Sequence, residues 1–374
     1  MNVLDTPQRL ADVYARRGPF ATVYLDATRA TESGAQEIAR RWAAVRDELE
    51  RAGADTATLD AVAGAVEADT GTPGRHGIVV VAAGGDVCLR DVLPQPPSRS
   101  SGSWSPVPRL LPYLGQRTTE IAHLVVVADR GGADLLSVGP GGAREQTVAG
   151  ERDYPMHRTA ADVWNERHFQ HRVENTWESN AQNVADAVAK LIAESPARLV
   201  VVAGDVRARN LIAEALGSPP GVTVRVIEEG GRAAGSSTEA LQAAVHDAVL
   251  QQVWRDRREV LEHLQQNLGR QEYAVAGVAP VVEALRMSQV DTLVISDDPS
   301  SPLTAWVGPE PLQFGLDDGE AEAMGVAEIE HDRLDAALVR AAVGTNARLV
   351  ITPGGHEYLA EGIGALLRYQ TAGD

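Results

Sequence analysis

The chain has 374 residues, one cysteine and a formal net charge of −18 at pH 7. Its length predicts two or three domains. A single cysteine excludes an internal disulfide, and we expect Cys88 to be a buried thiol in a reducing compartment. The N-terminus has no continuous apolar region, and no window approaches the length of a membrane-spanning helix. We therefore expect a cytoplasmic protein with no signal peptide, no membrane contact and no cofactor.

The negative charge is concentrated in the last third of the chain. Basic and acidic residues number 13 and 14 in residues 1–118, 12 and 16 in residues 119–233, and 9 and 22 in residues 234–374. Phosphate binding depends on clustered Lys and Arg, so this distribution leaves the first two thirds open to a nucleic-acid partner. All basic residues but Lys190 are arginines, whose planar groups bind phosphate in a bidentate manner. The acidic segment 308–335 is expected to be a solvated loop.

The first third contains a recognisable strand, two helical patterns and a hairpin. In chain order, we expect a helix to about residue 17, a strand in 18–28, helices over 32–51 and 56–68, a hairpin over 76–93 and a Pro/Ser-rich loop over 94–108. The hairpin turns at Gly84-Gly85, because paired glycines favour a two-residue turn.

The rest of the chain alternates strands with helices. We expect strands within 123–150, a long helix to about 192, a strand over 197–204 with a helix after it, a strand over 222–229, helices over 238–268 and 278–287, a strand over 290–298, a helix over 331–345, a strand over 347–354 and a final helix over 362–370. Such alternation predicts α/β (α+β) layers in domains bounded at 1–118, 119–233 and 234–374.

Most short motifs in the chain have no catalytic signature. The Gly-rich turns lack the endings that a phosphate-binding loop or a dinucleotide fold requires, and no serine lies in a nucleophile elbow. Asp205 lies between a strand and a helix and is expected to cap the helix. Asp297 and Asp298 follow an apolar strand but have no partner in a recognisable motif, so we interpret them as loop residues.

The stretch from Tyr154 to Trp177 is the strongest candidate site. Its helical part has an apolar stripe, which we expect in the core, formed by Phe169, Val173, Trp177, Val184, Val188 and Leu191. A second row faces outward, formed by His168, His171, Arg172, Asn175 and Ser179. Ahead of it, a segment with His157, Arg158, Trp164 and Arg167 suits RNA, because guanidinium groups contact phosphates and an indole ring stacks on a base. The alternative is a packed surface loop whose Trp164 folds back on the helix.

A metal site in the same stretch is a further alternative. His168 and His171 are three residues apart, the minimum for a metal pair on one helical face. His157 or Glu174 would have to supply a third ligand, and the spacing fits no zinc pattern. We therefore expect no metal, and a metal-dependent nuclease remains an alternative function.

Three separated parts of the chain resemble the archaeo-eukaryotic peptide-chain release factors and their relative Pelota. VDTLVISDD and GIGALLRY are similar to their third domain; LVVVADRGGADLLSV, ARLVVVAGDVRARNLIAEAL and the helix after Trp164 to their middle domain; and GPFATVYLDAT with two helices to their first domain. The segment WNERHFQHRVE is similar to the bacterial branch of the family, which includes a ribosome-hibernation factor. The resemblance covers nearly the whole chain.

The resemblance implies a three-domain, tRNA-shaped protein with an α/β middle domain and an α/β sandwich third domain. It implies binding to the vacant ribosomal A site, with 16S rRNA at the decoding centre and 23S rRNA at the peptidyl-transferase centre. Whether elongation factor Tu accompanies it stays open. The segment HRTAADVWNERHFQ lacks the GGQ that positions water for peptide release, and RAGADTAT lacks the codon-reading NIKS motif.

These absences lead us to expect a non-enzymatic hibernation or stress factor. A peptidyl-tRNA hydrolase with Gln170 in place of GGQ is the main alternative. The expected rRNA-binding residues are His157, Arg158, Trp164, Asn165, Arg167, His168, Gln170, His171 and Arg172.

Overall fold

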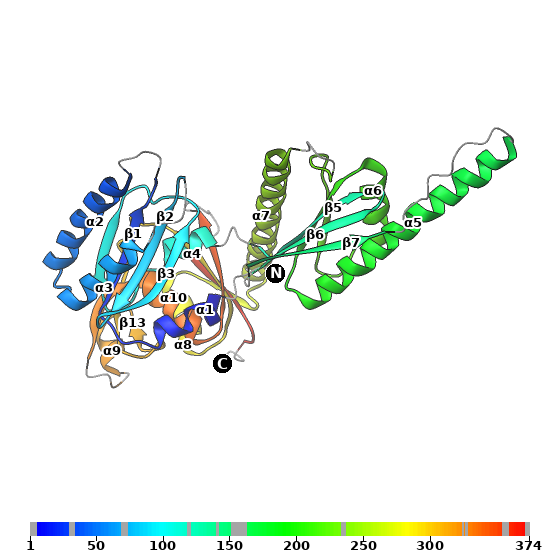
Figure 1. Cartoon of the computed structure of the whole chain (residues 1–374). Helices are drawn as coiled ribbons and strands as arrows, with labels where there is room; N and C mark the ends of the chain where they lie inside the picture. Colours follow the sequence, from blue (N-terminus) through cyan, green and yellow to red (C-terminus); the bar gives the residue numbers. More distant parts are fainter. Residues whose placement is uncertain are drawn as a thin grey trace. The chain divides into compact units, whose positions relative to one another are not determined.

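The structure is a computed structural model whose described residues pack into two compact units (Figure 1). It describes residues 6–29, 34–68, 74–117, 121–139, 142–150, 163–232, 237–323, 325, 328–353 and 359–370, with backbone alone at 6–9, 163–176, 321 and 353. We call Thr119–Arg258 the middle unit, and Val3–Thr118 together with Glu259–Asp374 the composite unit. The fold confirms the expected mixed α/β class. The three-domain division stays a prediction, because packing alone groups the first and last segments.

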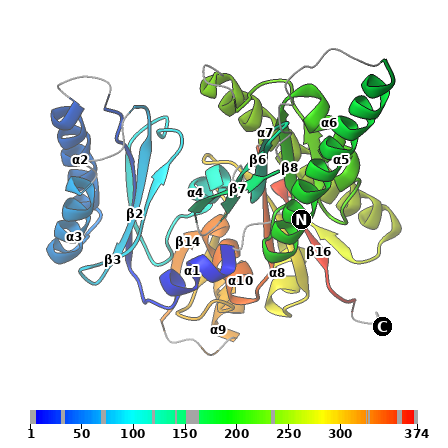
Figure 2. The ribbon, with the colours of Figure 1, turned by 45° about the vertical axis from the view of Figure 1, so that its right-hand side comes forward.

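The composite unit begins with an antiparallel sheet in the order β3-β2-β1-β4. Its strands are β1 (Phe20–Asp26), β2 (Gly77–Ala83), β3 (Asp86–Leu93) and β4 (Ser101–Ser105). Helices α2 (Gly34–Arg51) and α3 (Thr56–Glu67) cover one face (Figure 2). The hairpin turn at Gly84-Gly85 is confirmed, since both residues have positive φ. The Pro/Ser-rich segment, expected to be a loop, contributes strand β4.

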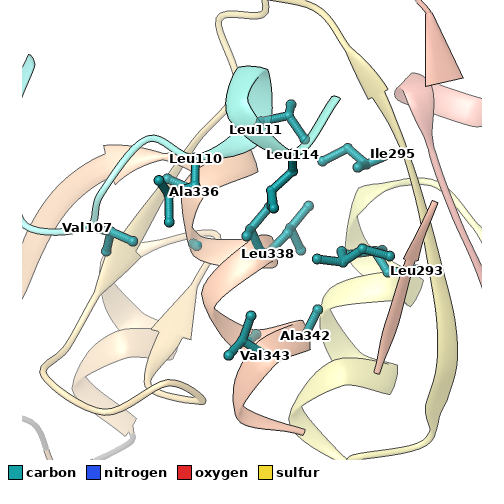
Figure 3. Packing of buried hydrophobic residues seen from close by; sticks show 14 of the residues in the cluster. Val107, Leu110, Leu111, Leu114, Leu293, Ile295, Ala336, Leu338, Ala342 and Val343 are labelled. Atoms are coloured by element: carbon teal, nitrogen blue, oxygen red, sulfur yellow. The ribbon is translucent and has the colours of Figure 1, made fainter. Parts of the chain in front are cut away.

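The other face of this sheet belongs to a core that the first and last segments of the chain share. Tyr24 and Val81 lie in the same buried cluster as Leu293 and Leu338. The helices in this core are α1 (Thr6–Tyr14), α4 (Leu111–Arg117), α8 (Val278–Arg286) and α10 (Leu334–Gly344). Figure 3 shows Leu110, Leu111 and Leu114 close to α10 and β11. Residues more than 200 positions apart therefore depend on each other for burial.

The C-terminal sheet has the order β10-β16-β11-β15. Its strands are β10 (Ala274–Ala276), β11 (Val290–Asp297), β15 (Arg348–Pro353) and β16 (Ile363–Leu367), with a short 3-10 helix, η1 (Ala360–Gly362), before the last. The expected final helix over 362–370 is therefore wrong, because Ile363–Leu367 is an antiparallel strand between β10 and β11. Ile363 and Ala365 face the shared core while Leu366 packs with α7 residues on the opposite face. A short apolar run buried on both faces has no periodicity that separates strand from helix.

The acidic segment 308–335 is structured over much of its length, so a solvated loop is the wrong description. A three-stranded sheet in the order β13-β12-β14 includes β12 (Thr304–Val307), β13 (Phe314–Gly315) and β14 (Glu330–Arg333), beside helix α9 (Asp318–Ala323). Phe314 is fully buried. The buried Asp332 accepts hydrogen bonds from the backbone N–H of Val107 at 3.0 Å and of Arg333 at 2.7 Å. Burial raises the pKa of Asp332.

The middle unit is a five-stranded sheet in the order β7-β6-β5-β8-β9. The strands are β5 (His123–Asp129), β6 (Gly132–Gly139), β7 (Gly142–Ala149), β8 (Leu199–Gly204) and β9 (Thr223–Val226). Helices α5 (Val163–Glu194) and α6 (Val206–Leu216) pack on one face, and the first part of α7 (Thr238–Arg270) packs on the other. Val200 and Val202 face α5 and α6, whereas Leu199, Val201 and Ala203 face α7, as strand alternation requires.

Cys88 is half-buried in β3, so the expectation of a buried thiol is wrong. Burial nevertheless raises the pKa of the Cys88 thiol. Among the described helices, none has the length and hydropathy that crossing a bilayer requires.

Candidate nucleic-acid interface

Helix α5 carries most of the predicted RNA-binding residues on its first turns. Its 32 residues correspond to a length of about 48 Å, and Figure 1 shows it running well past the strands of the middle unit. Its C-terminal half is anchored, since Val184 and Val188 are fully buried. His157 and Arg158 lie outside the described residues. The helix contains Trp164, Asn165, Arg167, His168, Gln170, His171 and Arg172, whose side chains also lie outside the described part. Their contacts with RNA stay a prediction.

Trp177 lies where α5 meets the sheet, and it is half-buried rather than in the core as expected. Two guanidinium groups lie over its ring. Arg130, from the turn between β5 and β6, places its Cζ 5.0 Å from the ring centroid, and Arg207, from the first turn of α6, places its Cζ 4.7 Å away. Such cation–π contacts each contribute about 0.5–2 kcal/mol. Of the predicted stripe, Phe169 and Val173 lie outside the described side chains, and Trp177 contacts two cations instead of the core.

Asn180, one turn beyond Trp177, is buried and holds the β5–β6 turn against α5. Its Nδ2 donates a hydrogen bond to the carbonyl oxygen of Arg130 at 3.1 Å. A Cβ on Gly150 would collide with the Asn180 side chain, so only glycine fits where the chain leaves β7. Asn180 thus contacts both the β5–β6 turn and the residue that follows β7.

Arg232 neutralises the carboxylates around this turn. It donates hydrogen bonds to Asp129 at 2.8 Å and to Asp134 at 2.9 and 3.2 Å. Burial alone would raise the pKa of Asp134, but hydrogen bonds from Arg232 and Thr147 outweigh it and lower that pKa. Arg232 therefore pairs with both acids that flank the β5–β6 turn.

The junction between β8 and α6 has the predicted cap. The side chain of Asp205 accepts hydrogen bonds from the N–H groups of Arg207 at 3.0 Å and Ala208 at 3.2 Å. Gly204 has a φ of +110°, and its N-terminal neighbours run parallel to β5. This cap positions Arg207 over Trp177.

Trp177→Ala is expected to destabilise the middle unit by about 2 kcal/mol, because it removes half-buried apolar surface and both cation–π contacts. Trp177→Phe keeps an aromatic ring beneath the two guanidinium groups, so its loss of stability should be less than half that of Trp177→Ala. Amide hydrogen exchange in β5 and β8 measures both effects. Equal exchange rates for Trp177→Ala and the wild type would show that the contacts contribute nothing.

A second aromatic and basic cluster, on α7, was missed by the sequence reasoning. Trp254 is 51% exposed, and the guanidinium of Arg257 lies 5.1 Å from its ring centroid. Arg255 and Arg258 are exposed on the same stretch. The signal is in the sequence as WRDRR, a tryptophan with arginines one, three and four positions later. It was overlooked because the segment fits a helical pattern throughout.

Asp297 is the last residue of β11 and not a loop residue, whereas Asp298 lies beyond the strand. Asp297 lines a cavity of about 330 Å³ together with Asp335 and Glu361. Burial, followed by the charges of Asp335 and Asp298, raises the pKa of Asp297. Asp298 accepts hydrogen bonds from the N–H and Oγ of Ser300 at 2.9 and 2.6 Å. Among the described side chains, no three His, Cys, Asp or Glu residues are placed to hold a metal ion.

Several known proteins are similar to this chain. Two uncharacterized proteins of Mycobacterium tuberculosis, one from strain H37Rv and one from strain CDC 1551 / Oshkosh, are each 27% identical over 369 residues, covering 97% of this chain and 96% of theirs. Among solved structures, Archaeoglobus fulgidus Pelota is 15% identical with a TM-score of 0.36, covering 80% of this chain and 86% of its own. Saccharomyces cerevisiae Dom34, a translation termination-like factor, is 10% identical with a TM-score of 0.39, covering 80% and 81%.

The family comparison supports the resemblance to release factors and locates it. The matched segment begins at the first residues of the five-stranded sheet and ends with the last residue of α7. It therefore contains α5, the Trp177 contacts and the Trp254 cluster. Residues 122–270 match the model of bacterial archaeo-eukaryotic release factor family 2.

Proposed function

We propose that this protein is a ribosome-binding factor that occupies the vacant A site from the decoding centre to the peptidyl-transferase centre without releasing the peptide. The observation that carries the proposal is the match of residues 122–270 to a release-factor family model. Release factors act on the ribosome, so the ribosome, through its 16S and 23S rRNA, is the proposed partner. The resemblance to the bacterial branch that includes Balon favours hibernation under stress.

The proposed absence of catalysis rests on the segment that precedes α5. No GGQ tripeptide occurs anywhere in the sequence. Residues 157–170 carry cations, an amide and an indole ring instead, which suit contact with RNA. In this proposal Trp164 stacks on a base, Arg158, Arg167 and Arg172 contact phosphates, and the protein blocks the site.

The acidic last third of the chain suggests a protein partner in addition to rRNA. Its net charge of −13 repels phosphate groups and complements a basic protein surface. A translational GTPase such as elongation factor Tu is one candidate. Adding it to purified ribosomes and this protein, and measuring whether the affinity rises, tests that role.

The decisive experiment is co-sedimentation of the purified protein with vacant ribosomes at low and high salt. We expect binding at low salt that weakens as salt rises. Charge reversal of Arg158 and Arg172 to Glu should lower the affinity roughly ten-fold or more, since each charge-assisted phosphate contact is worth about 1.5–3 kcal/mol. The matched control reverses Arg99 and Arg270, two exposed arginines of the composite unit, and should change the affinity far less.

Two outcomes would contradict the proposal. If the wild-type protein does not co-sediment with vacant ribosomes at low salt, ribosome binding is wrong. If single-turnover assays on stalled complexes detect peptide release, and Gln170→Ala abolishes it, the protein is a release or rescue enzyme instead.

A further inference from the structure

Trp254 is an exposed aromatic side chain on α7, a helix that is buried along one face only. On the inner face of α7, Val249 and Val253 are buried against the sheet of the middle unit. Trp254 is next to Val253 in sequence but is 51% exposed. The exposed half of its ring is available to a partner, since an indole combines a large apolar face with a polar edge.

Within residues 254–258 the exposed charges are positive. Arg255 and Arg258 are exposed, and Arg257 lies over the indole ring. The one acid in this run, Asp256, is buried, accepts a hydrogen bond from Gln252 at 2.6 Å and lies 3.4 Å from Nε of Arg198. Three arginines therefore lie within four residues of Trp254, and the nearest exposed acid in sequence is Glu259, which follows them.

Helical geometry groups these side chains into one surface. Residues three and four positions apart are neighbours on a helix, so Arg257 and Arg258 flank Trp254 one turn away. Arg255 points toward β9, where its Nη1 lies 3.5 Å from Oγ1 of Thr223.

We propose that Trp254 with Arg255 and Arg258 is a single-stranded RNA contact, in which the indole ring stacks on an unpaired base and the two exposed guanidinium groups bind the flanking phosphates. An aromatic platform beside a row of cations is the arrangement that binds single-stranded RNA in many folds. The inference rests on the proposed function only in taking this RNA to be ribosomal. It adds a contact on α7, distinct from the residues at the start of α5.

The test measures the affinity of the full-length protein for a labelled single-stranded oligoribonucleotide of about ten nucleotides, and separately for vacant ribosomes. Trp254→Ala should weaken oligonucleotide binding at least five-fold, the effect of losing one stacked base, and Trp254→Phe should restore most of it. Arg255→Glu with Arg258→Glu should reduce the salt dependence by about 0.7 in log–log slope for each phosphate that the variant no longer neutralises. The control is Arg99→Glu, the same charge change at a side chain that is 81% exposed. It should lower the affinity for the oligonucleotide less than Arg255→Glu or Arg258→Glu does alone.

Each result separates this inference from the proposed function. Weakened oligonucleotide binding by Trp254→Ala supports the inference even if the wild type fails to bind ribosomes, which would contradict the proposed function alone. Unchanged oligonucleotide affinity with weakened ribosome binding would mean that Trp254 contacts a ribosomal protein, and the inference is wrong. Wild-type protein that binds neither the oligonucleotide nor ribosomes overturns both. Because Trp254 is half exposed, Trp254→Ala should lower the unfolding midpoint only slightly, through loss of the Arg257 contact, and this measurement controls for misfolding.

Discussion

Gly204→Ala should destabilise the middle unit by about 4 kcal/mol or more, a large fraction of the stability of an ordinary domain. Gly204 has a φ of +110°, a conformation that L side chains rarely adopt. A Cβ at this position would also collide with the backbone carbonyl oxygen of Ala128 in the neighbouring strand. That oxygen accepts a hydrogen bond from Asp205 N–H at 2.9 Å, so it is held in place. Steric collision and backbone strain therefore act together where the helix cap begins.

The matched control is Gly217→Ala, at the C-terminal end of α6. Gly217 also has positive φ, +57°, but a Cβ there would meet nothing within 4 Å. This variant should lower the stability of the middle unit by about 1–3 kcal/mol, because backbone strain acts there without a collision. Thermal unfolding and near-ultraviolet circular dichroism of both variants measure the difference. If Gly204→Ala keeps the wild-type transition, the close approach of β8 to β5 is not as the structure has it.

Leu338→Ala should destabilise the composite unit by about 2–5 kcal/mol and do so in both of its chain segments. Leu338 is fully buried in α10, inside the cluster that joins the first and last segments (Figure 3). Removing the Leu338 side chain leaves a cavity that is lined by residues of both chain segments. Hydrogen exchange should therefore accelerate in β2 as well as in β11, although about 250 residues separate Leu338 from β2.

The control for this variant is Met287→Ala, at a residue that is 42% exposed just beyond α8. It should change stability by less than about 1 kcal/mol. Strands β5 and β8 of the middle unit should exchange at the wild-type rate in both variants. Faster exchange in β11 with β2 unchanged would show that the two segments form independent cores.

Local signals in the sequence predicted the parts of the fold that depend on neighbouring residues. The strand before Gly204, the Asp205 cap and the helix after it all follow from alternation, capping and periodicity within about 20 residues. The Gly84-Gly85 turn has the same origin. Strand β16 was mistaken for a helix because its burial on both faces comes from β10 and β11, far away in sequence.

Long-range partners explain why other predictions were wrong. The buried carboxylate of Asp332 accepts a hydrogen bond from the N–H of Val107, which is 225 residues away. The local composition shows only an acidic segment, so it predicts that Asp332 is exposed to solvent. Trp177 fits a core stripe by spacing, but its covering groups come from residues 130 and 207. Trp254 was missed for the opposite reason, since its exposure depends on which face of α7 meets the sheet. Periodicity locates a helix but does not supply the partner of each side chain.

The order of segments along the chain has a consequence for synthesis. The middle unit is inserted between two segments that complete one core, so residues 20–93 emerge from the ribosome long before β11 and α10 do. Until then the sheet face formed by Phe20, Tyr24, Val79 and Val81 has no permanent cover. The middle unit has its own core and needs no later residue beyond α7 to close it. The nascent chain thus carries an exposed apolar surface through most of its translation, the condition in which holding chaperones prevent aggregation.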